Sequence, residues 1–185
     1  MSATREALLS KDVLFELLPA AFGPWGNSSW YPSWPPTEAS IGRIERELGV
    51  RLPALLVDVA RACPSYGGWF GSIGDDFDSH NHILSINRTF REEGLPPRYV
   101  LLNHGHDGDC DAWDTQMPPI EGELPIVYFR YDTDRRELRG LRPSATSFAT
   151  YLNAFVRQHA PRCPEKNLRR RAKQLLAGYE QAPTG

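Results

Sequence analysis

Histidine and aspartate, the residue types that most often ligate divalent metals, are concentrated in two short segments of this chain. Each segment holds two histidines separated by one residue: His80 and His82 in the first, His104 and His106 in the second. Residues two apart share a face only on a strand, and the second pair falls at a predicted turn. No HExxH motif occurs. The pattern favours polar turn histidines, and a metal-dependent enzyme using these His and Asp turns is kept as an alternative.

Other motifs for chemistry are incomplete. The segment that begins at Asp107 superficially resembles a calcium loop, but its sixth position is Ala112 instead of glycine and its twelfth is Pro118 instead of glutamate. The sequence has no GxSxG nucleophile motif and neither of the glycine-rich phosphate motifs. We therefore predict a protein that is not an enzyme and that uses no metal and no cofactor.

The segment 99–115, YVLLNHGHDGDCDAWDT, predicts a β-hairpin, because an Asp-Gly pair stands between two extended runs. The strand period of two puts Asp109, Asp111 and Trp113 on one face and Cys110 on the other, where it is expected to fill the core. Two carboxylates cannot be buried unpaired, so their face should meet solvent or a partner. Trp113 would instead be a core residue if the parity were inverted.

The surrounding sequence supplies both helices and strands. Apolar spacing and capping residues predict helices over 4–18, 37–49, 53–64, 144–155 and 164–178. Strands are predicted over 69–73, 124–131 and 137–141, while 83–90 fits either element.

Two segments admit alternative interpretations. Residues 19–36 combine prolines with tryptophans, which predicts an ordered loop lying across the core, or else a solvent-facing tryptophan cluster for a ligand. The last helix carries several arginines, but its apolar stripe favours docking on the core over contact with nucleic acid.

Length and composition favour one soluble domain. The chain has 185 residues, of which 41% are hydrophobic and 24% charged. No apolar run approaches the roughly 20 residues that cross a bilayer, and the first residues lack the apolar region of a secretory signal. Three cysteines without a CxxC pair are typical of a reducing compartment. We expect a cytoplasmic protein without a membrane partner.

Charge is distributed in blocks. Residues 72–134 contain thirteen acidic residues against four arginines, and residues 135–185 contain eleven basic residues against three glutamates. These blocks carry −9 and +8 within a net charge of −2. Such blocks steer encounters with partners, unless they neutralise each other inside the fold.

The order of the segments resembles the SMI1/KNR4 family, also called the SUKH superfamily. IGRIERELGVRLPALLVDVARAC is similar to the family's "E..LG..LP" helix pair, and Gly67-Gly68 stands at its glycine-rich turn. NHGHDGDCDAWDT resembles the "G.GD.y.fD" segment, LPIVYFRYD the late "PVy.w.hd" strand, and SATSFATYLNAF the closing "SF..FL" helix. Pro64-Ser65-Tyr66 departs from the usual Asn before the glycine pair.

The resemblance implies a single α+β domain in which a mixed or antiparallel sheet packs against several helices. It implies a core domain over 37–160, preceded by a helix and Pro/Trp-rich loop extension at 1–36 and followed by a basic helix and tail at 161–185. It further implies a bacterial immunity protein that binds and neutralises a cognate polymorphic toxin. A regulatory or scaffolding protein of the same fold is the alternative.

A −9 segment would accelerate encounter with a basic partner, so a toxic nuclease is the first expectation for the toxin. Nucleic acid itself is not expected as a direct partner. Aromatic anchors within the acidic surface would supply affinity. The residues expected to contact the toxin are Asp75, Asp76, Asp78, Asp107, Asp109, Asp111, Trp113, Tyr131 and Asp132.

Overall fold

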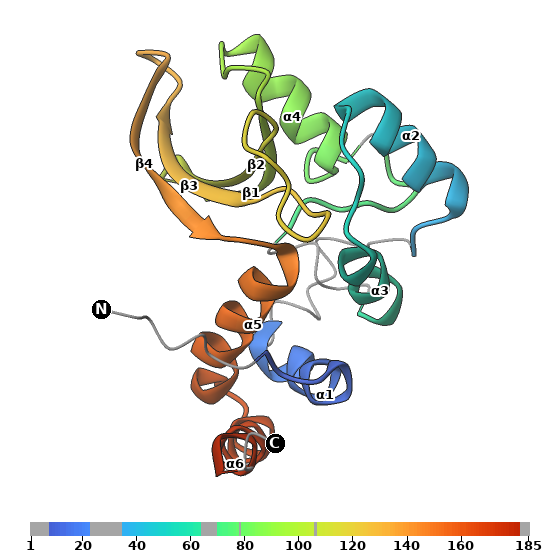
Figure 1. Cartoon of the computed structure of the whole chain (residues 1–185), viewed down its shortest axis with the longest axis vertical. Helices are drawn as coiled ribbons and strands as arrows, with labels where there is room; N and C mark the ends of the chain where they lie inside the picture. Colours follow the sequence, from blue (N-terminus) through green and yellow to red (C-terminus); the bar gives the residue numbers. More distant parts are fainter. Residues whose placement is uncertain (1–7, 23–34, 64–69, 78, 106, 182–185) are drawn as a thin grey trace.

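The computed structural model describes residues 8–22, 35–63, 70–77, 79–105 and 107–181 (Figure 1). The helices among these residues are α1 (Lys11–Phe22), α2 (Glu38–Leu48), α3 (Ala54–Ala62), α4 (Ile83–Glu92), α5 (Phe148–His159), the short 3₁₀ helix η3 (Ala160–Arg162) and α6 (Lys166–Gln181). The strands are β1 (Tyr99–His104), β2 (Asp109–Asp114), β3 (Ile126–Asp132) and β4 (Glu137–Ala145). The predicted α+β class is confirmed.

The four strands form one antiparallel sheet in the order β1-β2-β3-β4. The predicted hairpin is present, with β1 and β2 joined through Gly108 at φ 78°. Between β2 and β3 the register pairs Asp109 with Arg130, Asp111 with Tyr128 and Trp113 with Ile126. Paired residues point to the same side of a sheet, so β2 and β3 together define its two faces.

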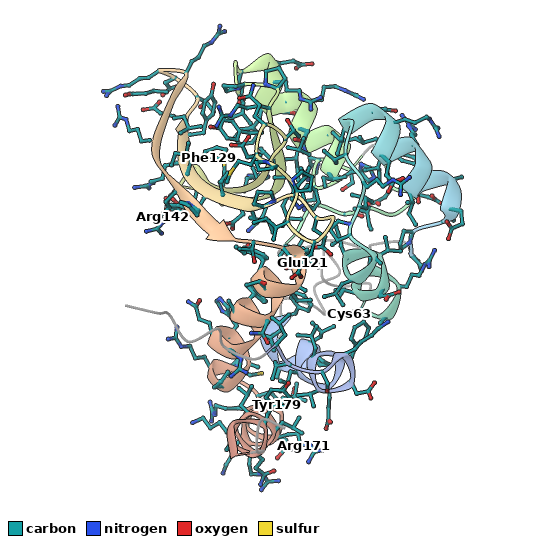
Figure 2. The ribbon with its side chains drawn as sticks, viewed as in Figure 1. Cys63, Glu121, Phe129, Arg142, Arg171 and Tyr179 are labelled. Atoms are coloured by element: carbon teal, nitrogen blue, oxygen red, sulfur yellow. The ribbon has the colours of Figure 1, made fainter. Side chains whose placement is uncertain are left out.

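One face, here called the α4 face, is covered by α4. The strand side chains on this face are Tyr99, Leu101, Cys110, Ala112, Val127, Phe129 and Tyr131. Together with Ile86 and Leu95 they form a small core of their own. Figure 1 shows the sheet curving around this side, and Figure 2 shows Phe129 inside the curve and Arg142 on β4 at the sheet edge. The expectation that Cys110 fills core is confirmed, and burial raises the pKa of its thiol to about 12.

The other face, here called the α5 face, carries Asp109, Asp111, Trp113, Ile126, Tyr128 and Arg130. Its Trp113–Ile126 end lies in the main core together with Phe148 and Leu152 of α5. That core continues through α1, α2, α3 and α6. Toward Asp109 and Arg130 the same face reaches solvent, so it changes from core to surface along the strands.

Helix α4 also closes the free edge of β1. The side chain of Asn87 donates to the Leu101 carbonyl (2.9 Å) and accepts from the Leu101 amide (2.7 Å), at a bulge in the strand. The amide of Gly71 donates to the carbonyl of Leu102 at 3.0 Å. The opposite edge is formed by β4, whose residues are mostly exposed and whose pairing with β3 shifts register twice. Irregular, charged edges discourage pairing with other strands.

Several predicted boundaries are confirmed by their capping residues. Thr37 and Ser40 form a capping box at the start of α2, and Gly49 ends that helix at φ 70°. Helix α3 follows Pro53 directly. The last helix begins at Lys166, two residues after Pro164.

Other boundaries differ from the predictions. Segment 83–90 is helical, because His82 caps α4 by accepting from the Leu84 amide. Ser144 lies in β4, and Ser147 is the cap of α5. Helix α1 continues past Pro19 to Phe22, since the residues after the proline are buried in the core. Helix α6 likewise continues through Gly178. In the described part of the strand expected at 69–73, the structure has one isolated bridge, between Ser72 and His82.

Residues 23–34, which hold most of the expected tryptophan loop, lie outside the described residues.

Candidate functional site

The solvent end of the α5 face brings together the two aspartates that the hairpin pattern singled out. Asp109 accepts a hydrogen bond from the Tyr128 hydroxyl at 2.6 Å and pairs with Arg130, whose Nε lies 3.1 Å from its carboxylate. The hydrogen bond to Asp109 raises the pKa of Tyr128. The guanidinium of Arg142 lies 4.5 Å from the centre of the Tyr128 ring. β2, β3 and β4 each contribute a side chain to this surface.

Asp111 is more enclosed than Asp109. It accepts from the Tyr151 hydroxyl of α5 at 2.7 Å, and Ser144 of β4 also donates to it. Burial raises the pKa of its carboxyl group, although these two hydrogen bonds and the positive charge of Arg142 act in the opposite direction. Burial, together with the neighbouring carboxylate, raises the pKa of Tyr151 well above its usual value.

A pocket of about 290 Å³ opens beside Asp111, between the sheet and α5. Asn103, Ser144 and Tyr151 line it together with Asp111, and Phe155 and His159 form its wall on α5. The rings of Phe155 and His159 are stacked, with centres 4.4 Å apart. Burial lowers the pKa of His159, which favours its neutral form. The pocket therefore combines one carboxylate with neutral polar groups and aromatic rings.

The α5 face is mixed in charge, where an acidic surface was expected. Arg130 and Arg142 stand beside Asp109 and Asp111, so acidic and basic side chains meet on the same strands. Arg135 of the β3–β4 turn likewise lies 3.8 Å from Asp132. The acidic and basic blocks of the sequence thus neutralise each other locally where the β3–β4 hairpin joins them.

The two aromatic residues expected to anchor a partner are in the core. Trp113 is 1% exposed and Tyr131 is 4% exposed, so neither side chain lies on the surface at which it was expected to anchor a partner. Trp113 is a core residue although the predicted parity of β2 holds, because it lies at the end of β2 that α5 covers. Tyr131 points to the α4 face, and its hydroxyl donates to the Glu93 carbonyl at 3.0 Å.

The remaining predicted contact residues lie elsewhere. Asp107 and Asp132 line a wider depression of about 500 Å³ at the hairpin turn, next to Tyr131 and His104. Asp75 accepts from Thr37 at 3.0 Å and Asp76 from Ser72 at 2.7 Å, so both stabilise the loop before α4. Asp78 lies outside the described residues.

Three of the four histidines that prompted the metal hypothesis are described and are dispersed, and His106 lies outside the described residues. His82 is buried, caps α4 with one ring nitrogen and lies 3.2 Å from the Gly74 carbonyl with the other. Burial lowers its pKa. His80 is exposed, and the ring of His104 packs 5.4 Å from that of Phe90. Within the described ranges, no group of three or more His, Cys, Asp or Glu side chains could hold a metal ion.

Sequence reasoning missed Tyr151, Asn103, Ser144 and Arg142 as site residues. The spacing of Tyr151 along its helix predicts a core residue, and its ring does pack against the main core. Its hydroxyl reaches Asp111 only because α5 crosses the sheet at this point. No local pattern in the sequence encodes that crossing.

Residues 35–154 match the model of the SMI1 / KNR4 family (SUKH-1), which covers α2 to the middle of α5. The chain belongs to this family. No curated protein matches the sequence. Within the described part of the chain, no helix is both long and apolar enough to cross a bilayer.

Proposed function

We propose that this protein is a non-enzymatic immunity protein that binds and neutralises a cognate protein toxin, with the solvent end of the α5 face as its contact surface. Membership of the SMI1 / KNR4 family is consistent with an immunity-type protein. The observation that carries the proposal is the pair of part-exposed carboxylates, Asp109 and Asp111, fixed on neighbouring positions of one strand by Tyr128, Tyr151 and Arg130.

The hydrogen bonds and the ion pair that hold these side chains support a binding role. Side chains that are already ordered lose little entropy when a partner arrives, so more of the contact energy becomes affinity. Charges held at fixed positions also discriminate between partners, because a misplaced like charge is repelled. A toxin with basic residues facing the two aspartates would fit, and a basic nuclease remains the proposed partner class.

Co-expression with the protein encoded by the neighbouring gene tests the proposal. The wild-type chain is expected to restore growth and to co-elute with that protein in gel filtration. Asp109→Arg reverses one charge at the centre of the surface and is expected to reduce affinity at least tenfold. Glu92→Arg makes the same charge change at an exposed position of α4, and this variant is expected to neutralise the toxin as well as wild type does.

Unchanged toxicity with no complex in gel filtration would overturn the proposal. Recovery of several endogenous partners in place of one toxin would support the regulatory alternative.

The helices α1 and α6, which flank the family match, pack into the main core, so they stabilise the domain directly.

A further inference from the structure

Asp111 differs from the other carboxylates of β2 and β3 in its partners. Asp109 pairs with Arg130 and Asp132 with Arg135, while buried Asp114 pairs with Arg98 at 2.8 Å. In the part of the chain that the structure describes, Asp111 accepts only from the neutral hydroxyls of Tyr151 and Ser144. Among the described residues, no lysine or arginine lies within 4.0 Å of its carboxylate.

A carboxylate has about four positions for hydrogen-bond donors, so two hydroxyls leave part of its accepting capacity unused. The free capacity borders the 290 Å³ pocket, which Asp111 itself lines. An enclosed carboxylate with no directly paired cation is unfavourable, and the more distant charge of Arg142 offsets this only in part, because burial still raises the pKa of Asp111. A cation that entered the pocket would remove the remaining penalty. An anion would be repelled, and an apolar group would bury Asp111 further without compensation.

The other walls of the pocket also suit a cation. Phe155 and Tyr151 contribute aromatic rings to the lining, and aromatic surroundings favour a cation over an anion. Asn103 and Ser144 add side-chain oxygens that can accept from a donor-rich group. The volume of about 290 Å³ lies at the lower end of small-molecule sites, which suits one side chain.

We propose that the pocket formed by Asn103, Asp111, Ser144, Tyr151, Phe155 and His159 is a receptor site for one guanidinium or ammonium group. Arginine fits best, because its planar fork can donate to Asp111 and to a second acceptor at once. The proposal rests on the proposed function for the source of the group, an arginine or lysine side chain that the toxin inserts at the centre of the interface.

Titration of the ¹⁵N-labelled full chain with N-acetyl-arginine methylamide tests the pocket without any toxin. Saturable shifts are expected at the amides of Asn103, Asp111 and Tyr151. The citrulline analogue, which has the same shape without the charge, is expected to bind at least tenfold more weakly. Asp111→Asn is expected to weaken arginine binding at least tenfold, while Glu92→Gln, which removes one exposed carboxylate from α4, leaves it within twofold.

A second variant keeps the test independent of how Asp111→Asn folds. Ala154 is exposed and lines the pocket, so Ala154→Trp would fill the opening and leave the carboxylate in place. It is expected to abolish the arginine-induced shifts. Absence of saturable shifts up to 100 mM ligand, or equal binding of the citrulline analogue, would overturn the proposal.

Failure of the pocket and failure of the proposed function give different results. If Asp111→Asn and Ala154→Trp still neutralise the toxin at wild-type affinity and arginine amide does not bind, the pocket proposal falls and the function stands. If arginine amide binds as expected but no toxin is neutralised, the receptor site stands, and its ligand is a free cation such as a small amine.

Discussion

Asp111 is the residue at which stability and binding oppose each other most directly. Its carboxylate is enclosed by β2, β4 and α5, and burial raises its pKa. The groups facing it are the hydroxyls of Tyr151 and Ser144, the carboxylate of Asp109 and the more distant guanidinium of Arg142. An ionised carboxylate in such an enclosed position lowers the stability of the free protein. A bound cation that neutralises this carboxylate recovers that energy, which increases its affinity.

The resulting pH dependence has a definite sign. A carboxyl group with a raised folded-state pKa holds its proton more tightly in the folded chain, so the folded state loses stability as pH rises from the unfolded pKa through the folded one. Asp111→Asn removes this loss. We expect the variant to be more stable than wild type at pH 7 and this difference to shrink toward pH 4.

Urea denaturation at a series of pH values from 4 to 8 measures the effect. Glu92→Gln, which removes an exposed carboxylate from α4, reports the contribution of net charge alone. A pH-independent difference between Asp111→Asn and wild type would contradict the assignment of the raised pKa to this carboxyl group.

Among the structural elements, the hairpin turn between β1 and β2 is fixed by close contact with β3. Gly108 has φ 78°, and its carbonyl accepts from the Tyr131 amide at 2.8 Å. A Cβ atom at this position would lie 2.5 Å from the Tyr131 carbonyl oxygen. The glycine is therefore required by its backbone conformation and also by the approach of the next strand.

A pair of alanine substitutions separates these two requirements. Gly122 also has positive φ, but a Cβ there would meet no atom within 4 Å. Gly122→Ala should cost about 1 kcal/mol, from backbone strain alone. Gly108→Ala should cost about 3 kcal/mol, because the backbone must also move away from Tyr131. Equal losses in urea denaturation would show that the approach of β3 is not a constraint.

The elements differ in how far the sequence predicts them. Thr37, Gly49 and Pro53 define α2 and α3 because caps and breakers act within a few residues. The same holds for the Asp-Gly hairpin. The sequence alone leaves α4 ambiguous, since its start depends on the His82 side chain. It predicts β4 too short, because the residues of this strand are exposed on both sides. Strand periodicity is weak without a buried face.

The candidate site was predictable only in part. The parity of β2 correctly put Asp109, Asp111 and Trp113 on one face. It could not show that α5 covers one end of that face, which buries Trp113 and half-buries Asp111. The arginines opposite the aspartates come from later strands, so the cancellation of charge depends on sheet register, which a single sequence does not specify.

At the scale of the whole molecule, the core extends beyond the family match at both ends. Helices α1 and α6 lie outside residues 35–154, yet buried residues of both belong to the main core with Trp113. Arg171 of α6 pairs with Glu16 of α1 at 2.6 Å, and the Tyr179 hydroxyl donates to the Leu8 carbonyl. Figures 1 and 2 show α6 beside α1 below the end of α5.

We therefore expect the flanking helices to unfold together with the sheet. Leu17 of α1 is 1% exposed, and Leu17→Ala should destabilise the chain by about 2–5 kcal/mol in one cooperative transition. Leu8, which is 47% exposed, provides the matched control, with an expected loss below about 1 kcal/mol. Denaturation followed by far-UV and near-UV circular dichroism tests this, and two separate transitions would contradict a shared core.

The exposure of β4 has a consequence for how the protein can diversify. Apart from Leu138 and Ala145, which are partly buried against the two cores, this strand contributes little to packing, and it stands at the margin of the Asp111 pocket through Ser144. Substitutions there change the exposed surface of the sheet edge while leaving the core intact. Under the proposed function, the residues of β4 can therefore vary as the partner changes at little cost to the fold, whereas most residues of β2 are buried and cannot.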